Sequence, residues 1–413
     1  MKNNVVLVTL SVLALLFVFY TLVLSSSWKL IPRLNPYTNV SQTRRRKILQ
    51  GFEKEPPQQL KRETKKLFTR FGIEKSTKPS VGTKTLEKSS PRSNLIILSP
   101  GRGGSSFLGG VFNANPDIMY WFEPLHTLSR DIYELHLFKD KERRIQYSKT
   151  SINVISSFLN CSFTQIPKDI ISALSKSIFR SRSASLSSEH LCPTKDKTKK
   201  CLPYSAKLLG EVCNSTKYTV LKILTSRLPR YTLESFQGIF QQQQYKIKAI
   251  HLVRDPRAVI YSMVNSVQWI NISSFLNQRF RDVVHGVCSP IEKNIKFGLF
   301  SPPSWLKSRF RVIRYEDLIV DTTNMAMDLY KFAGFDWSIR INKWIATHQR
   351  KPRSNNQKDP YSLYRDASLV VNKWKKAPTS LITAVEEVCG NLMDMLGYKR
   401  MIKSYEKVTR SRS

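Results

Sequence analysis

A short apolar segment followed by a glycine-rich turn constrains the fold of this chain more than any other feature. Residues 94–98 read Asn-Leu-Ile-Ile-Leu, which is the pattern of a short buried strand. The turn of residues 99–106, Ser-Pro-Gly-Arg-Gly-Gly-Ser-Ser, follows directly, and residues 107–112 favour a helix. Backbone N–H groups at a helix start, freed of side-chain bulk by glycine, bind phosphate. The segment therefore predicts an anion site between a strand and a helix.

Four more segments have the composition of buried strands. They are residues 118–122, 218–224, 247–253 and 310–313. Helices are expected from Pro256 and after Asp317. Strands that alternate with helices imply a parallel sheet with crossover connections. The predicted fold class is therefore α/β, with a central parallel sheet flanked by helices.

The residues of the glycine-rich turn are the first candidate binding residues. The glycines allow a close approach, the serines add hydroxyl donors, and the arginine adds a fixed positive charge with a fork of donors. No Gly-Lys-[Ser/Thr] closes the turn, which disfavours an ATPase or a nucleotide kinase. An ordinary flexible turn is the alternative interpretation. The candidates are Gly101, Arg102, Gly103, Gly104, Ser105 and Ser106.

A second group of candidates follows the segment 247–253. Asp255 is a natural N-cap, and Pro256 is a natural first helical residue. Arg254 stands at the end of the predicted strand, where α/β sheets bind their ligands. Ser262 lies about two turns into the helix that follows. We expect Arg254 and Ser262 to hold one phosphate together.

These two groups resemble motifs of the Golgi carbohydrate sulfotransferases, the galactose, N-acetylglucosamine and N-acetylgalactosamine 6-O-sulfotransferase family. Residues 102–107, Arg-Gly-Gly-Ser-Ser-Phe, are similar to its 5′-phosphosulfate loop, usually Arg-Ser-Gly-Ser-Ser-Phe, which adds Phe107 to the candidates. Residues 254–259 followed by Ser262 resemble its 3′-phosphate motif. The resemblance covers roughly residues 93–400, and further similar segments are 113–124, 314–318 and 374–375.

The resemblance implies a P-loop-like sulfotransferase fold, a glycan acceptor and 3′-phosphoadenosine 5′-phosphosulfate (PAPS) as the donor. Glu123 is the expected general base for the acceptor hydroxyl, since a carboxylate within reach of a hydroxyl suits that role. The alternative is an exposed glutamate that caps a neighbouring helix. Arg102 is expected to stabilise the leaving 3′,5′-bisphosphate. No metal is expected, because arginine and backbone donors supply the charge.

Some residues depart from the family pattern or have a competing interpretation. Gly103 replaces the usual serine of the loop, Lys375 replaces an arginine, and Thr225 stands where an arginine often follows Lys222. Lys222 and Lys375 are each expected to be solvated surface lysines, although either could assist transfer. Histidine at position 251 is expected to be a core residue with satisfied hydrogen bonds. His126 is not expected to be the base while Glu123 is near it.

The N-terminus predicts a membrane anchor. Residues 5–24 are apolar and uncharged, which matches a bilayer-spanning helix of about 20 residues. We expect an uncleaved signal anchor, with a cleaved signal peptide as the alternative. Residues 1–4 are the predicted cytoplasmic tail. Residues 25–92, basic and rich in Pro, Ser and Thr, are the predicted stem, and residues 93–413 form the sulfotransferase domain.

Sequons and cysteines place the body of the chain in the lumen, as a single-pass type II protein of the Golgi membrane. Four N-x-[ST] sequons begin at residues 39, 160, 214 and 271. Six cysteines without CxxC spacing indicate one to three disulfides rather than a metal site, with free buried thiols as the alternative. A local bridge is expected among Cys192, Cys201 and Cys213.

The net charge of +37 indicates a polyanionic partner. A lumenal location removes the chain from nucleic acid, so the charge favours an acidic glycan such as keratan or chondroitin sulfate. A catalytically inactive, membrane-anchored binding protein for acidic glycans is the alternative function. The acceptor sugar, the oligomeric state and any cleavage that releases the body from the stem are not determined by the sequence.

Overall fold

The computed structural model describes residues 92–128, 141–192, 203–242, 246–265, 275, 277–349, 363–364 and 371–401. These residues belong to one compact unit, Ser90–Ser413. The predicted tail and anchor, and the predicted stem before Arg92, lie outside the described residues. Among the helices of the described ranges, none has both the length and the apolar composition needed to cross a membrane.

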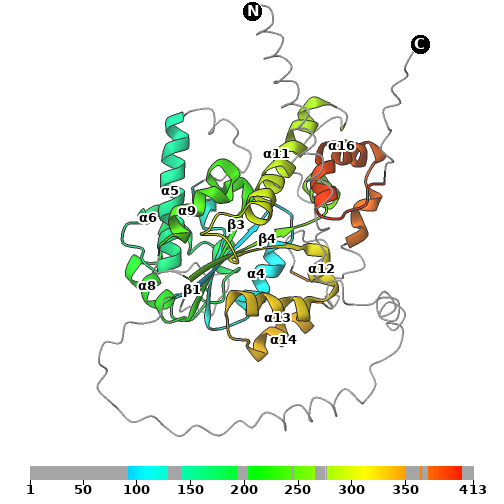
Figure 1. Cartoon of the computed structure of the whole chain (residues 1–413). Coiled ribbons are helices and arrows are strands. Elements are labelled where there is room, and N and C mark those ends of the chain that lie inside the picture. Colours follow the sequence, from blue (N-terminus) through cyan, green and yellow to red (C-terminus); the bar gives the residue numbers. More distant parts are fainter. Residues whose placement is uncertain are drawn as a thin grey trace, which may run out of the picture. The chain divides into compact units, whose positions relative to one another are not determined.

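Five parallel strands form the centre of the domain (Figure 1). Each predicted strand is confirmed to within one residue at either end. The order across the sheet is β2-β3-β1-β4-β5, so consecutive strands are joined by crossovers. The strands are β1 (Ser93–Ser99), β2 (Ile118–Phe122), β3 (Tyr218–Leu224), β4 (Lys246–Val253) and β5 (Phe310–Arg314).

Helices connect these strands and cover the sheet. The helix predicted at residues 107–112 is α4 (Ser105–Asn113), and the helix predicted from Pro256 is α10 (Pro256–Asn265). The other α-helices are α5 (Lys141–Asn160), α6 (Lys168–Ala173), α7 (Ser177–Arg180), α8 (Ala206–Asn214), α9 (Gln237–Phe240), α11 (Gln278–Ile295), α12 (Tyr315–Val320), α13 (Thr322–Ala333), α14 (Ile339–His348) and α16 (Thr379–Met395). Short 3₁₀ or π turns are η2 (Pro124–Thr127), η4 (Thr225–Arg227), η5 (Pro229–Tyr231), η6 (Leu233–Phe236), η7 (Lys296–Phe300) and η9 (Lys373–Lys376).

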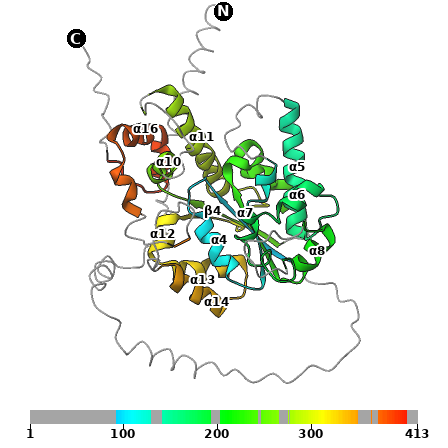
Figure 2. The ribbon, with the colours of Figure 1, turned by 180° about the vertical axis from the view of Figure 1, so that it is seen from behind.

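Alternation along the strands gives the sheet two apolar faces. In β1, Ile96 and Leu98 belong to one core cluster, and Leu95 and Ile97 belong to the other. The first face is covered by α5, α6, α8 and α9, and the second by α4, α13 and α14 (Figures 1 and 2). Both faces of a parallel sheet are normally buried in this way, which explains why the strands read as continuous apolar runs.

A third cluster holds α10 in place beside β4. Apolar residues of α10, α11 and α16 pack together in it, and a disulfide between Cys288 of α11 and Cys389 of α16 crosses it. Ser262 lies on α10. The position of this candidate residue therefore depends on the packing of two cross-linked helices.

A second disulfide joins Cys161, just after α5, to Cys213 of α8. Cys213 therefore takes no part in the local bridge expected among Cys192, Cys201 and Cys213, because the fold brings the end of α5 beside α8 across 52 residues. Cys192 is also disulfide-bonded, and Cys201 lies outside the described residues.

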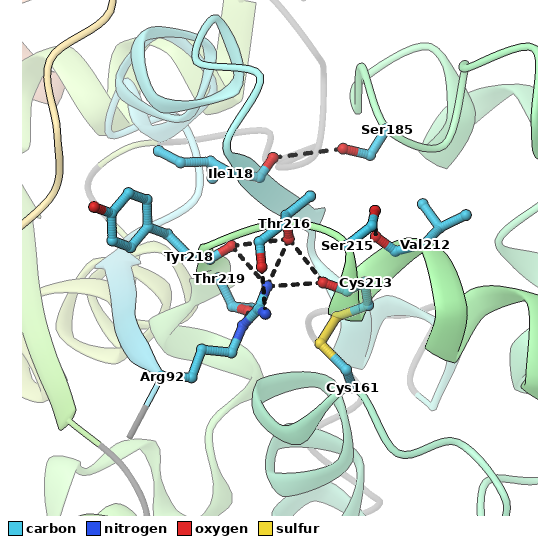
Figure 3. Close-up of a disulfide and its surroundings, with 10 residues drawn as sticks. All are labelled: Arg92, Ile118, Cys161, Ser185, Val212, Cys213, Ser215, Thr216, Tyr218 and Thr219. Atoms are coloured by element: carbon cyan, nitrogen blue, oxygen red, sulfur yellow. Dashed lines mark hydrogen bonds between the residues drawn. A yellow bond between two sulfur atoms is a disulfide. The ribbon is translucent and has the colours of Figure 1, made fainter. Parts of the chain in front are cut away.

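Arg92 ties the start of the domain to this disulfide. Its guanidinium donates to the carbonyls of Cys213 and Thr216, at 2.9 and 2.5 Å, and to the hydroxyl of Thr219 at 2.8 Å (Figure 3). Several donors of one planar fork are thus satisfied at once, which only arginine provides. The residue just before β1 is thereby held against the turn that leads into β3.

His251 is fully buried on β4, and neither of its ring nitrogens has a hydrogen-bond partner in the described part of the chain. The expectation of a core residue is confirmed, but the expectation of satisfied hydrogen bonds is wrong. The sequence shows only an apolar strand around this residue, and the partners of a buried ring depend on tertiary packing. Burial lowers the pKa of His251 to about 3.

Neutral burial of His251 makes stability depend on pH. Below about pH 6.5 the imidazole of His251 becomes protonated in the unfolded chain but stays neutral in the folded chain. The free energy of unfolding therefore falls as the pH falls from about 6.5 toward 3. The loss amounts to about 2 kcal/mol at pH 5. We expect His251→Leu to reduce the difference in unfolding free energy between pH 7 and pH 5 by about that amount, measured by urea denaturation. The exposed His285→Leu is the control, and equal pH dependence in wild type and His251→Leu would contradict the prediction.

Candidate functional site

The candidate residues gather at the carboxyl edge of the sheet. All strands are parallel, so the turns after β1, β2, β3, β4 and β5 leave from one edge. Arg102 follows β1, Glu123 follows β2, and Arg254 follows β4. The structure therefore places these three candidate residues at one edge of the sheet.

The glycine-rich turn has a conformation that requires glycine at position 104. Gly104 has a φ of +93°, in the left-handed region, and a Cβ atom there would lie 2.1 Å from the ring of Tyr315. Arg102 is also left-handed, with a φ of 63°. The N–H of Gly103 donates to the carbonyl of Pro100 at 3.0 Å, which closes the turn.

The start of α4 offers backbone donors to an anion. The first N–H groups of a helix have no partner within the helix. No side chain caps this end, and no acidic residue lies in the first turn. Ser105 is buried and Ser106 is half-buried at these positions. Phe107 points elsewhere: its ring is fully buried and packs 5.4 Å from the ring of Trp344.

Arg102, Ser262 and Arg254 form one hydrogen-bonded group. The Nε of Arg102 donates to the hydroxyl of Ser262 at 3.0 Å, although 160 residues separate them. The guanidinium of Arg254 donates to the carbonyl of Arg102, also at 3.0 Å. The structure thus brings together the two motifs that the sequence separates, with two guanidinium groups and a hydroxyl beside the start of α4.

Tyr315 and Glu316 support this group, a role that sequence reasoning did not assign to them. The ring of Tyr315 lies 4.8 Å below the guanidinium of Arg254. Glu316 accepts hydrogen bonds from the N–H of Asp255 at 3.1 Å and from the hydroxyl of Tyr398 at 2.7 Å. Burial raises the pKa of Glu316. The segment after β5 therefore fixes the turn that carries Arg254.

Asp255 begins α10 as predicted. Its carboxylate accepts from the N–H of Arg257 at 2.9 Å, which is an N-cap contact. Arg257 also forms buried ion pairs with Asp255 and Glu386, and its guanidinium lies 3.8 Å from the ring centre of Trp374. These contacts tie the start of α10 to α16.

Glu123 lies in a second, buried group of charges. It is only 8% exposed, and its two carboxylate oxygens pair with the ammonium of Lys222 and the guanidinium of Arg227. Burial alone would raise the pKa of Glu123, but Lys222 and Arg227 outweigh it and hold the pKa below its usual value. Glu123 is therefore ionised at neutral pH.

One expectation about this group is wrong, and the alternative interpretation of Glu123 is excluded. Lys222 is not a surface lysine but is 2% exposed, because the parallel register places it opposite Phe122 and next to Glu123. Glu123 is not an exposed cap, and its side chain caps no helix. The sequence analysis did not identify Arg227 as a site residue. Its partner Glu123 lies 104 residues earlier in the chain, and the sequence of the short turn η4 gives no sign of this pairing. Lys375 is exposed, as expected.

His126 lies beside Glu123 but is bound differently. Its backbone N–H donates to the carbonyl of Glu123 at 2.8 Å, and its ring meets the ring of Phe179 edge to face. Burial lowers the pKa of His126. Within the described ranges, no group of three or more His, Cys, Asp or Glu side chains is arranged to hold a metal ion.

The fold and the site define an α/β protein with two arginine side chains and the uncapped start of α4 at one edge of its parallel sheet. The chain belongs to the sulfotransferase domain family, whose profile matches residues 92–397. It is 26% identical to carbohydrate sulfotransferase 1 of Danio rerio over 338 residues, which covers 75% of this chain and 79% of that protein. It is 28% identical to carbohydrate sulfotransferase 3 of Mus musculus over 340 residues, covering 75% of this chain and 68% of that protein.

The solved structures that resemble this fold are more distant. The sulfotransferase domain from the curacin biosynthetic pathway is 19% identical, with 75% of this chain and 99% of that chain covered and a TM-score of 0.41. The assignment to the family therefore rests on the sequence profile.

The contact between Gly104 and Tyr315 predicts a sharp difference between two glycine substitutions. We expect Gly104→Ala to lower the free energy of unfolding by about 1–3 kcal/mol, because the methyl group meets the ring and the backbone is left-handed. Gly238→Ala is the matched control, since no atom lies within 4 Å of its added Cβ and it lies in α9. Chemical denaturation of both variants measures the difference, and equal stability would contradict this account of the turn.

Proposed function

We propose that this chain transfers a sulfuryl group from PAPS to a sugar hydroxyl of a glycan, at the 6-position of galactose, N-acetylglucosamine or N-acetylgalactosamine. The observation that carries the proposal is the junction of Arg102, Arg254 and Ser262 at the sheet edge where Glu123 also lies. Membership of the sulfotransferase domain family supports sulfuryl transfer. The carbohydrate sulfotransferases among its relatives support a sugar acceptor.

The donor set suits a nucleotide with two phosphate groups. Arg102 and the backbone N–H groups between Gly101 and Ser106, apart from that of Gly103, which donates to Pro100, would hold the 5′-phosphosulfate. Arg254 and Ser262 would hold the 3′-phosphate, with Arg102 linking both ends because it already bonds to Ser262. Guanidinium, hydroxyl and backbone N–H donors suit the oxygens of a phosphate dianion. Such contacts do not involve the bases of a nucleic acid.

The sheet order separates donor and acceptor functions. The turn after β1 lies between β4, which carries Arg254, and β3, which carries Lys222. Glu123 follows β2 on the far side of β3. An acceptor hydroxyl bound near Glu123 would therefore approach the donor from the side opposite to the 3′-phosphate group.

Glu123 would accept the proton of the acceptor hydroxyl. The sugar oxygen then bonds to sulfur, and the bond from sulfur to the bridging oxygen of the 5′-phosphate breaks, leaving the bisphosphate with an added negative charge. Arg102 stabilises that charge. Because Lys222 and Arg227 each hold one oxygen of Glu123, one ion pair must loosen before the carboxylate takes a proton. Loosening it also raises the basicity of Glu123.

The location that we propose is the Golgi lumen, with residues 5–24 as a signal anchor of a type II membrane protein. The apolar run and four sequons support this topology. The disulfides Cys161–Cys213 and Cys288–Cys389 suit an oxidising compartment. The net charge of +37 favours an acidic acceptor such as keratan or chondroitin sulfate.

The direct test is transfer of radiolabelled sulfate from PAPS by the full chain to native and desulfated keratan, chondroitin and heparan chains. We expect incorporation into keratan or chondroitin, and linkage analysis of the product to give the 6-position. Donor binding without incorporation on any acceptor would favour the alternative of an inactive glycan-binding protein. Absence of donor binding would contradict the proposal.

Glu123→Gln separates the proposed base from donor binding within the same assay. The variant loses the acceptor of the proton, so we expect turnover to fall by about 10²–10⁴-fold with donor affinity retained. The substitution also leaves Lys222 and Arg227 without a counter-charge, so donor binding serves to show that the chain is folded. Retained turnover would contradict the assignment of Glu123 as the base.

A further inference from the structure

A cavity of about 630 Å³ lies between α5, the segment of residues 229–237 and the turn at residues 303–305. None of the proposed donor-binding residues lines it. Its walls combine an indole ring with amide, hydroxyl and charged groups, contributed by Arg230, Thr232, Glu234, Gln237, Gln241 and Trp305.

This combination of side chains suits a sugar ring. The apolar face of a sugar packs on an aromatic ring, and its hydroxyl groups need both donors and acceptors. Trp305 is held in position by Phe297 and Phe240, whose ring centres lie 5.9 and 5.4 Å away. Gln237 and Gln241 are exposed and carry amides that donate and accept. A few polar groups placed around an aromatic anchor are the usual composition of a ligand site.

One chain segment connects this cavity to the buried charges at Glu123. Arg227 pairs with Glu123, and Pro229, two residues further on, lines the cavity. The hydroxyl of Tyr147 donates to the carbonyl of Arg227 at 2.8 Å, and the next residue of α5, Ser148, also lines the cavity. A ligand in the cavity is therefore next to the segment that positions the partner of Glu123.

The same segment carries backbone strain. Arg230 and Tyr231 have φ angles of 54° and 59°, in the left-handed region that residues with a Cβ rarely adopt. Buried Asn294 of α11 holds them there, since its amide donates to the carbonyl of Tyr231 at 3.0 Å and its oxygen accepts from the N–H of Leu233 at 2.8 Å. Strain that is fixed from outside in this way is typical of binding sites.

Three hydroxyl groups of this segment are buried without a hydrogen-bond partner in the part of the chain that the structure describes. They belong to Thr225, Ser226 and Thr232, of which Thr232 lines the cavity. Buried polar atoms are almost always paired in a finished structure. The oxygen of Thr232 is covered by protein atoms, so this unpaired hydroxyl lies within the wall of the cavity.

We infer that this cavity is a subsite for a sugar unit of the acceptor glycan, at a distance along the chain from the unit that receives sulfate. The inference rests on the proposed function. The exposed edge of Trp305, which is 9% exposed, contacts that unit, Gln237 and Gln241 bind its hydroxyl groups, and exposed Arg230 binds a sulfate or carboxylate. The subsite makes affinity depend on the length of the acceptor, because a short acceptor fills only the position at Glu123.

The test uses the full chain with a chondroitin octasaccharide and a chondroitin disaccharide as acceptors. Gln241→Ala is compared with the control Gln242→Ala, which removes an adjacent exposed amide that does not line the cavity. We expect Gln241→Ala to raise the KM for the octasaccharide about fivefold, with the KM for the disaccharide and the kcat unchanged.

Calorimetric titration of both oligosaccharides, without donor, separates this inference from the proposed function. The subsite is supported if the wild type binds the octasaccharide more tightly than the disaccharide and Gln241→Ala loses this difference. This holds even if no sulfate is transferred. Sulfate transfer with equal octasaccharide affinity in wild type and Gln241→Ala overturns the subsite and leaves the proposed function intact. Equal affinity of wild type for the two oligosaccharides also overturns the subsite.

Discussion

The ring of Tyr315 packs against Gly104, and this contact joins the two halves of the candidate site, the glycine-rich turn and the turn that carries Arg254. One side of the ring leaves room only for a residue without a Cβ, and the guanidinium of Arg254 lies over it at 4.8 Å. Arg254 in turn donates to the carbonyl of Arg102. These contacts fix the turn after β1, the turn after β4 and the start of α12 relative to one another. The hydrogen-bond donors on the two turns therefore have fixed relative positions.

The charged side chains of the site form two groups with different partners. Arg102 donates to the hydroxyl of Ser262, and Arg254 donates to the carbonyl of Arg102, so in these two contacts the guanidinium groups bond to neutral oxygens. Such groups are suited to bind an anion. Glu123 instead is neutralised by two cations in a site that is 8% exposed. If an acceptor hydroxyl displaced one of these cations, the other cation would still hold the carboxylate of Glu123 in position.

Local signals in the sequence were sufficient for the framework of the fold. Each strand has its own apolar run, the glycine-rich turn marks the start of α4, and Asp255-Pro256 marks the start of α10. The joint position of Arg102, Arg254 and Ser262 followed from the rule that parallel strands end at one edge. The sequence analysis placed Lys222 wrongly at the surface, and it did not identify Arg227 or the pairing of Cys161 with Cys213. Each depends on a partner that is tens of residues away in the chain and that only the fold brings close. His251 was misjudged for the same reason, since an apolar strand does not reveal which atoms face a buried ring.

The central claim is that the edge formed by Arg102, Arg254 and Ser262 binds the 3′,5′-bisphosphate of an adenosine donor. Calorimetric titration of 3′-phosphoadenosine 5′-phosphate into the full chain and into its Ser262→Ala variant tests it most directly. The account predicts saturable binding at one site, weakened about tenfold in the variant by loss of a hydrogen bond to a charged group. No binding to the wild type, or equal affinity in the two proteins, would contradict it.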